Sequence, residues 1–79
     1  MSERIIHDAA GRAWSVLPGR ESYGMQVLLF VAEDGGEVRK AMLAAQTQLD
    51  AWRELDGYSD DILRDRLAAS VDWAETLTW

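Results

Sequence analysis

A chain of 79 residues with a net charge of −6 and no cysteine sets narrow limits before any motif is considered. A chain of this length buries only roughly 60% of its unfolded surface, so we expect one domain of modest stability, residues 1–79. The lack of cysteine excludes disulfides and thiolate metal sites. The excess of acids argues against direct binding to nucleic-acid phosphates, which requires clustered Lys and Arg.

The apolar segments are too short for export or for a membrane. The first residues lack the apolar run of a signal peptide, and the longest apolar run, residues 27–32, is far shorter than a membrane span. We therefore expect a cytoplasmic protein that binds no membrane.

A four-residue turn that begins with Asp8 and ends with Gly11 predicts the first hairpin, because type I turns prefer these residues at these places. Gly11 supplies the left-handed backbone position. The resulting pairing sets Ile6 opposite Trp14, with Trp14 facing inward. Residues 18–24 are expected to form a loop that begins where Pro18 ends the second strand.

Residues 25–32 predict a central strand, because they are apolar on both faces. Two registers are open for the hairpin that follows. A two-residue loop opposes Leu29 to Met42, and a four-residue loop opposes Val31 to Val38. We prefer the second, because it pairs two β-branched residues. Charged residues in the strand that follows, 37–42, indicate a solvated or edge strand.

Residues 43–79 carry a helical pattern in two parts, with a break after residue 55. The first part, residues 43–55, predicts a helix whose inward face carries Ala45, Leu49 and Trp52. The second begins at the N-cap Ser59. Its apolar stripe consists of Ile62, Leu63, Leu67, Val71 and Ala74, and an Asp60–Arg64 pair supports it. The chain therefore predicts an α+β fold: a four-stranded antiparallel β-meander (residues 1–42) followed by two C-terminal α-helices (residues 43–79) packed on one face.

No motif for catalysis or for a cofactor occurs in the chain. His7 is the only histidine, and it points to the opposite strand face from Asp8, so the two do not form a dyad. Nucleophile elbows, phosphate-binding loops and dinucleotide fingerprints are missing. Acid pairs such as Asp61 and Asp65 do not follow a calcium-loop pattern. We expect no enzyme, no cofactor and no metal.

Four tryptophans in this short chain are the unusual feature of its composition. Trp14 and Trp52 fit the core pattern. Trp73 and Trp79 are both candidates for contact with a partner, and core completion is the alternative. We favour the core for Trp73 and the interface for Trp79. In the expected loop, Arg20 and Tyr23 are side-chain types that dominate binding hot spots, although loops that bind nothing contain them too.

Acidic residues concentrate in the second half of the chain. Residues 1–42 hold six acids and five bases, a charge of −1, whereas residues 43–79 hold eight acids and three bases, a charge of −5. Acids at the start of the last helix, Asp60, Asp61 and Asp65, are candidates for contact with a basic partner. The alternative is that the acidity only keeps the domain soluble.

Two patterns loosely resemble small uncharacterised bacterial proteins of similar length. One is the hairpin Gly11-Arg12-Ala13-Trp14-Ser15-Val16, and the other is Trp52-Arg53-Glu54-Leu55 in the first expected helix. The Gln-rich segment before Trp52 is longer here than in that pattern. The resemblance indicates a bacterial or phage origin and implies no activity.

Two hypotheses of function follow. The first is a non-enzymatic interaction module that binds a protein, or a second copy of itself as a dimer, through its sheet face or its aromatic C-terminus. The second is a phage-type inhibitor or nucleic-acid mimic that presents its acidic helices to a basic site.

Overall fold

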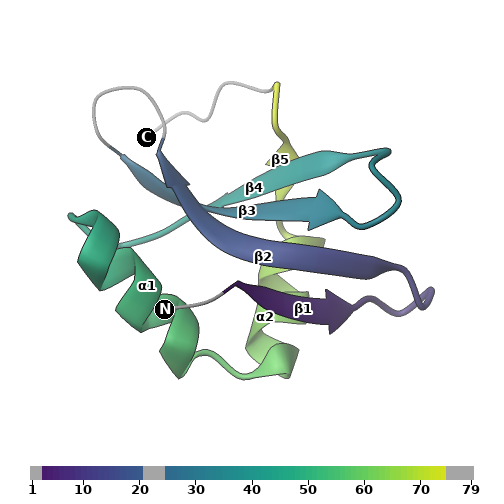
Figure 1. Ribbon diagram of the computed structural model, residues 1–79, viewed down its shortest axis with the longest axis horizontal. Helices are drawn as coiled ribbons and strands as arrows, with labels where there is room; N and C mark the ends of the chain where they lie inside the picture. The colour runs from purple at the N-terminus through teal and green to yellow at the C-terminus, as the bar shows by residue number, and fades with distance from the viewer. Residues whose placement is uncertain (1–2, 21–24, 75–79) are drawn as a thin grey trace.

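The computed structural model describes residues 3–20 and 25–74, which form an antiparallel sheet and two helices. The strands are β1 (Arg4–His7), β2 (Ala13–Arg20), β3 (Gln26–Ala32), β4 (Val38–Met42) and β5 (Val71–Asp72), and the helices are α1 (Gln48–Gly57) and α2 (Asp60–Ala68). The five strands lie in the sheet in chain order, so each pairs with its sequence neighbour (Figure 1). The α+β class is confirmed, and the meander gains a fifth strand after the helices.

Both predicted hairpin registers are confirmed. In the first hairpin Ile6 pairs with Trp14, and Gly11 has a φ of 83°, the left-handed conformation that its turn requires. In the second hairpin Val31 pairs with Val38, as the four-residue loop predicts. Turn chemistry and β-branched pairing were sufficient to set both registers.

The second strand is longer than expected, because Pro18 does not end it. β2 continues to Arg20, and Pro18 lies opposite Leu28 of β3. Glu33 donates its amide hydrogen to Ala13 at the other end of this ladder. Since hydrogen-bonded and non-hydrogen-bonded pairs alternate, the Pro18–Leu28 pair is one that needs no amide hydrogen from proline. The missing donor faces the β1 side, where the described β1–β2 pairing begins at Arg4 and Val16.

The core lies between the sheet and the two helices. From the sheet it takes Ile6, Trp14, Val16, Leu28, Phe30 and Ala32, and from the helices Ala51, Leu55, Leu63 and Leu67. Phe30, at the centre of the middle strand, is 0% exposed. The alternation of β3 thus directs one apolar set at the helices and leaves the other set on the opposite face.

The helices are shorter than the sequence pattern predicted. α1 begins at Gln48 rather than at residue 43, because the Thr47 side chain accepts a hydrogen bond from Asp50 and caps it. Its buried residues are Ala51 and Leu55, whereas Leu49, expected to face inward, is 43% exposed. The prediction is therefore wrong for Leu49. It is confirmed for Ala45 and Trp52, which are half-buried and pack against the core, although Ala45 lies before the helix begins.

The second helix begins as predicted and ends early. Ser59 is its N-cap, but α2 stops at Ala68 and the chain returns to the sheet as β5. Val71 pairs with Lys40 of β4, so β4 is an interior strand and the predicted edge position is wrong. The Lys40 side chain is 3% exposed.

Candidate functional site

The sheet face that points away from the helices is the first candidate, and we call it the outer face. The registers place nine apolar side chains on it, with Ser15 and Lys40 among them: Ile5, Leu17, Val27, Leu29, Val31, Val38, Met42, Val71 and Trp73. Val27 and Lys40 are buried there, but Ile5, Met42 and Trp73 are 48%, 43% and 45% exposed. Three large, exposed apolar side chains on one sheet face are typical of a surface that contacts another protein.

Trp73 belongs to this face and not to the core, so its predicted role in core completion is wrong. Its amide hydrogen bonds to the Val38 carbonyl at 3.0 Å, which continues the β4–β5 pairing by one residue. The Lys40 ammonium lies 5.3 Å from the centre of the indole ring. The pairing turns the ring outward, because Trp73 shares its sheet face with Lys40 and Val38 rather than with Phe30.

The second candidate is a network of charged side chains at the end of the sheet where the two tight hairpins turn. Arg12 donates to Asp34 at 3.0 and 3.1 Å and to Glu37 at 2.8 Å. Arg39 donates to the other Glu37 oxygen at 2.9 Å and, through Nε and Nη2, to the hydroxyl and carbonyl of Ser70. The Glu37 carboxylate is thus held between two guanidinium groups, and the network joins both hairpins to Ser70, the residue before β5.

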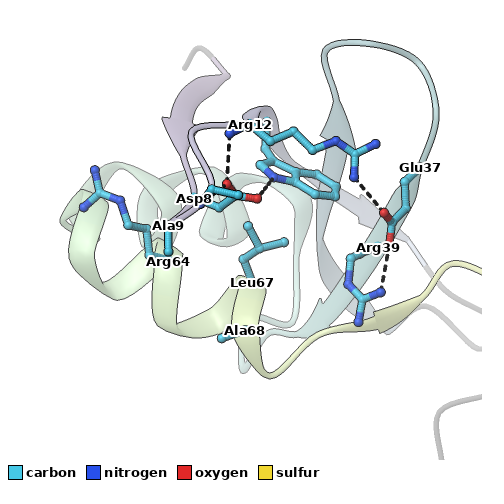
Figure 2. A pocket seen from close by; sticks show the side chains of 10 residues that line it. Asp8, Ala9, Arg12, Glu37, Arg39, Arg64, Leu67 and Ala68 are labelled. Atoms are coloured by element: carbon cyan, nitrogen blue, oxygen red, sulfur yellow. Dashed lines mark hydrogen bonds and ion pairs between the residues drawn. The ribbon is translucent and has the colours of Figure 1, made fainter.

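A hollow of about 640 Å³ opens beside this network, between the first hairpin, β4 and α2 (Figure 2). Its polar lining consists of Asp8, Arg12, Glu37, Arg39 and Arg64, and its apolar lining of Ala9, Ala10, Trp14, Leu67 and Ala68. The Trp14 indole donates to Asp8 at 3.0 Å, and the Arg12 guanidinium lies 4.7 Å from the centre of the same ring.

The hydrogen bonds around the hollow hold its carboxylates in the ionised form. The pKa of Asp8 lies below its usual value because the Trp14 indole and the Arg12 and Ala10 amides donate to it. Arg12 lowers the pKa of Asp34, and Arg39 and Arg12 lower that of Glu37.

Acid should therefore destabilise the fold, and Asp8 should account for a measurable part of the effect. A lowered pKa in the folded state means that stabilisation is present above the ordinary aspartate pKa, about 3.9, and is lost as pH falls through the lowered value. We expect Asp8→Asn to flatten the decline of Tm below about pH 4. The exposed Asp56→Asn is the control. Equal acid profiles for Asp8→Asn and the wild type would remove Asp8 from this role.

The predicted acidic surface on α2 is partly neutralised within the chain. Asp60 pairs with Arg4 of β1 at 2.5 Å, and Asp61 pairs with Arg64 at 2.7 Å. The predicted pair between Asp60 and Arg64 is wrong. Arg4 pairs with Asp60, and Arg64 pairs with Asp61, the next residue of α2. Asp65 is exposed on the same helix.

The remaining predicted residues are not brought together. Arg20 is exposed at the end of β2 and shares the sheet face of Pro18. Tyr23 and Trp79 lie outside the described residues. The sequence reasoning missed Arg12, Glu37 and Arg39. Arg12 directly follows the first predicted turn, and Glu37 directly follows the second. This equivalent placement is the feature of the sequence that could have identified them.

The described residues contain no group of three or more His, Cys, Asp or Glu side chains placed to hold a metal ion. Over residues 3–20 and 25–74, no helix is long and apolar enough to cross a membrane. Comparisons of the chain with family models, with curated proteins and with solved structures gave no match.

Proposed function

We propose that this chain is a non-enzymatic protein-interaction module that binds a partner protein through the outer face. The observation that carries the proposal is the exposure of Ile5, Met42 and Trp73 on one side of the sheet while both helices pack on the other. Trp73, the described member of the two aromatic residues near the C-terminus, lies on this same face. Burial of such side chains against a partner supplies free energy in proportion to the area removed from water.

The charge of the chain favours a particular kind of partner. Two copies, each of charge −6, repel one another at long range, whereas a basic protein is attracted. Glu33, bonded to Ser15 at 2.8 Å, adds an exposed acid at the border of the outer face. The partner is therefore a protein with an apolar patch bordered by Lys or Arg, in preference to a second copy.

Capture of a partner by variants of the outer face tests the proposal. Met42→Ser and Trp73→Ser should each lose the partner that the wild type retains, because each removes an exposed apolar side chain from the face. Ile62→Ser is the matched control, because Ile62 is 40% exposed but lies on α2, in the helical layer. Loss with Ile62→Ser alone would place the interface elsewhere. Sedimentation showing a dimer that Met42→Ser dissolves would replace the partner with a second copy.

The inhibitor or nucleic-acid mimic has less support. It needs free acids on the helices, and arginines within the chain already bind Asp60 and Asp61. It predicts a different outcome for the same captured partner: affinity would fall steeply with salt and with the neutralisation of Asp65, and Met42→Ser would leave it unchanged.

A further inference from the structure

The first strand lies at an edge of the described sheet, so one side of its backbone faces no other strand. Among the described strands, β1 pairs with β2 alone. An edge of this kind presents amide and carbonyl groups to which an extended segment of another protein can bond. β1 contains no proline, and its register with β2 runs without a bulge, so its own sequence does not block such pairing.

The hydrogen bonds of the first hairpin identify the backbone groups that face outward. Asp8 donates its amide hydrogen to the Arg12 carbonyl at 3.0 Å, so these two residues form a hydrogen-bonded pair. Bonded and non-bonded pairs alternate along an antiparallel ladder. The backbone groups of Ile6 therefore face β2, whereas those of Ile5 and His7 face the open edge.

A side chain from α2 supports this assignment and limits the length of the open edge. The Arg64 Nε donates to the His7 carbonyl at 2.7 Å, from the side opposite to β2. Among the described residues, nothing bonds to the Ile5 carbonyl or to the amides of Ile5 and His7. Three backbone groups are thus open, which is enough for a short added strand.

A strand added beside β1 has two different surroundings for its alternate side chains. Ile5 is 48% exposed on the outer face, so every second added side chain lies beside an apolar neighbour. The other side chains point toward the helical layer. α2 lies against β1 there, since Asp60 pairs with Arg4 and Arg64 contacts His7 (Figure 1).

The charges around this edge favour a basic segment. An aspartate of α2, Asp60 or Asp61, pairs with each of the two arginines at the edge. Two further acids are exposed nearby: Glu3 directly before β1, and Asp65 next to Arg64. Neither of these acids has an ion pair among the described residues, so the edge keeps a surplus of two negative charges. A second copy has the same surplus and is repelled.

We infer that the β1 edge binds an extended, antiparallel segment of a partner protein in which apolar residues alternate with Lys or Arg. The apolar side chains lie beside Ile5 and continue the outer face, and the basic side chains face α2. Backbone hydrogen bonds supply affinity in this mode, and the alternate side chains supply specificity. The inference goes beyond the outer-face proposal and does not depend on it, because it requires neither Met42 nor Trp73.

Amide hydrogen exchange of the ¹⁵N-labelled protein, measured by NMR with the capped peptide KVKVKVK, tests the inference. At saturation, the amides of Ile5 and His7 should exchange at least about tenfold more slowly, because they gain acceptors on the peptide. The Ile6 amide is the internal control. It already faces β2, so its exchange should change little.

Methylation of the peptide backbone tests whether hydrogen bonds at the edge hold the peptide. In an antiparallel pair, the residue opposite Ile5 has its amide toward β1 and its side chain on the outer face, so it is a valine. Methylation of the valine amides should raise the dissociation constant at least about tenfold. Methylation of the lysine amides, which point away from β1, should change it less than about threefold. The peptide EVEVEVE should bind at least about tenfold more weakly than KVKVKVK.

Variants of the edge place the peptide on β1. Ile5→Pro removes an outward amide without removing a bond to β2, and it should abolish binding. Ile5→Val keeps the amide and an apolar side chain, and it should retain wild-type affinity. Met42→Ser should also retain it, because Met42 lies on β4. The outer-face proposal and this inference can therefore fail separately.

Four results would overturn the inference. They are peptide binding that leaves the exchange of Ile5 and His7 unchanged, equal losses from the two methylation patterns, equal affinities for the basic and acidic peptides, and folded Ile5→Pro protein with wild-type affinity. Sedimentation that shows a dimer dissolved by Ile5→Pro would assign the edge to a second copy instead. If Ile5→Pro does not fold, the methylated peptides still decide the question with wild-type protein.

Discussion

Replacement of Phe30 by alanine is expected to lower the free energy of unfolding by about 3–5 kcal/mol. Phe30 is 0% exposed at the centre of β3, where it contacts the cluster that both helices complete. A domain of this length has a total stability of roughly 4–12 kcal/mol, so the loss removes a large part of it. Urea denaturation followed by circular dichroism measures the change.

Leu29→Ala is the matched control for this prediction. Leu29 is the preceding residue of the same strand, but it is half-buried on the outer face. We expect it to cost less than half as much as Phe30→Ala, because fewer of its atoms leave a packed environment. Equal losses for the two variants would show that the outer face is as well packed as the helical face.

The two hairpins could be predicted from the sequence because their determinants are local. Gly11 must adopt a positive φ within a turn that Asp8 opens, and Val31 and Val38 form a β-branched cross-strand pair. Each of these rules acts over a few residues, so no knowledge of the tertiary structure was needed.

The choice of the core face could not be predicted, because β3 is apolar on both sides. Which set is covered depends on where the helices pack, and this depends on their starting points. The N-cap of α1, Thr47, lies four residues after the first good helix former, Leu43. Leu43 instead donates its amide hydrogen to the Gln26 carbonyl and continues the sheet ladder. A tertiary hydrogen bond thus overrides helix propensity in this segment.

The sequence did not predict β5, because helix formation and strand pairing compete in this segment as well. Val71 lies on the apolar stripe of the predicted helix, but Val71 and Trp73 also have the two-residue spacing of a strand. The structure selects the strand, since β4 offers an edge to pair with and Ser70 bonds to the last turn of α2 through Leu67. Two residues are too short a strand for the period to be recognised in advance.

The charged network was missed because its members are distant in sequence. Arg12 and Glu37 are 25 residues apart, yet they lie at the same end of neighbouring hairpins. On their own, each is a typical solvated residue next to a turn. Only the registers of both hairpins together place them opposite one another.

Arg4 joins three elements of the fold, and no sequence pattern indicated this. From β1 its Nη1 donates to the carbonyls of Leu55 and Tyr58, at 3.2 and 2.8 Å, at the C-terminal end of α1. Its Nη2 donates to Asp60 in the first turn of α2 at 2.5 Å. The last turn of α1 contains no basic residue of its own, so Arg4 supplies the cation that the helix dipole favours at this end.

Arg4→Met should therefore lower the free energy of unfolding by about 1.5–3 kcal/mol, the range for hydrogen bonds to a charged group. The part-exposed ion pair with Asp60 contributes little to this figure, because water screens it; the loss comes mainly from the α1 carbonyls. For a domain of this length, Tm should fall by about 4–8 °C per kcal/mol. Arg53→Met removes an equal charge from an exposed pair with Asp50, 4.0 Å apart, and should change stability by less than about 0.5 kcal/mol. Hydrogen exchange should show faster opening at the end of α1 in Arg4→Met alone, since that is where the carbonyls lose their donor. If Arg4→Met and Arg53→Met melt together, the contacts between Arg4 and α1 do not stabilise the fold.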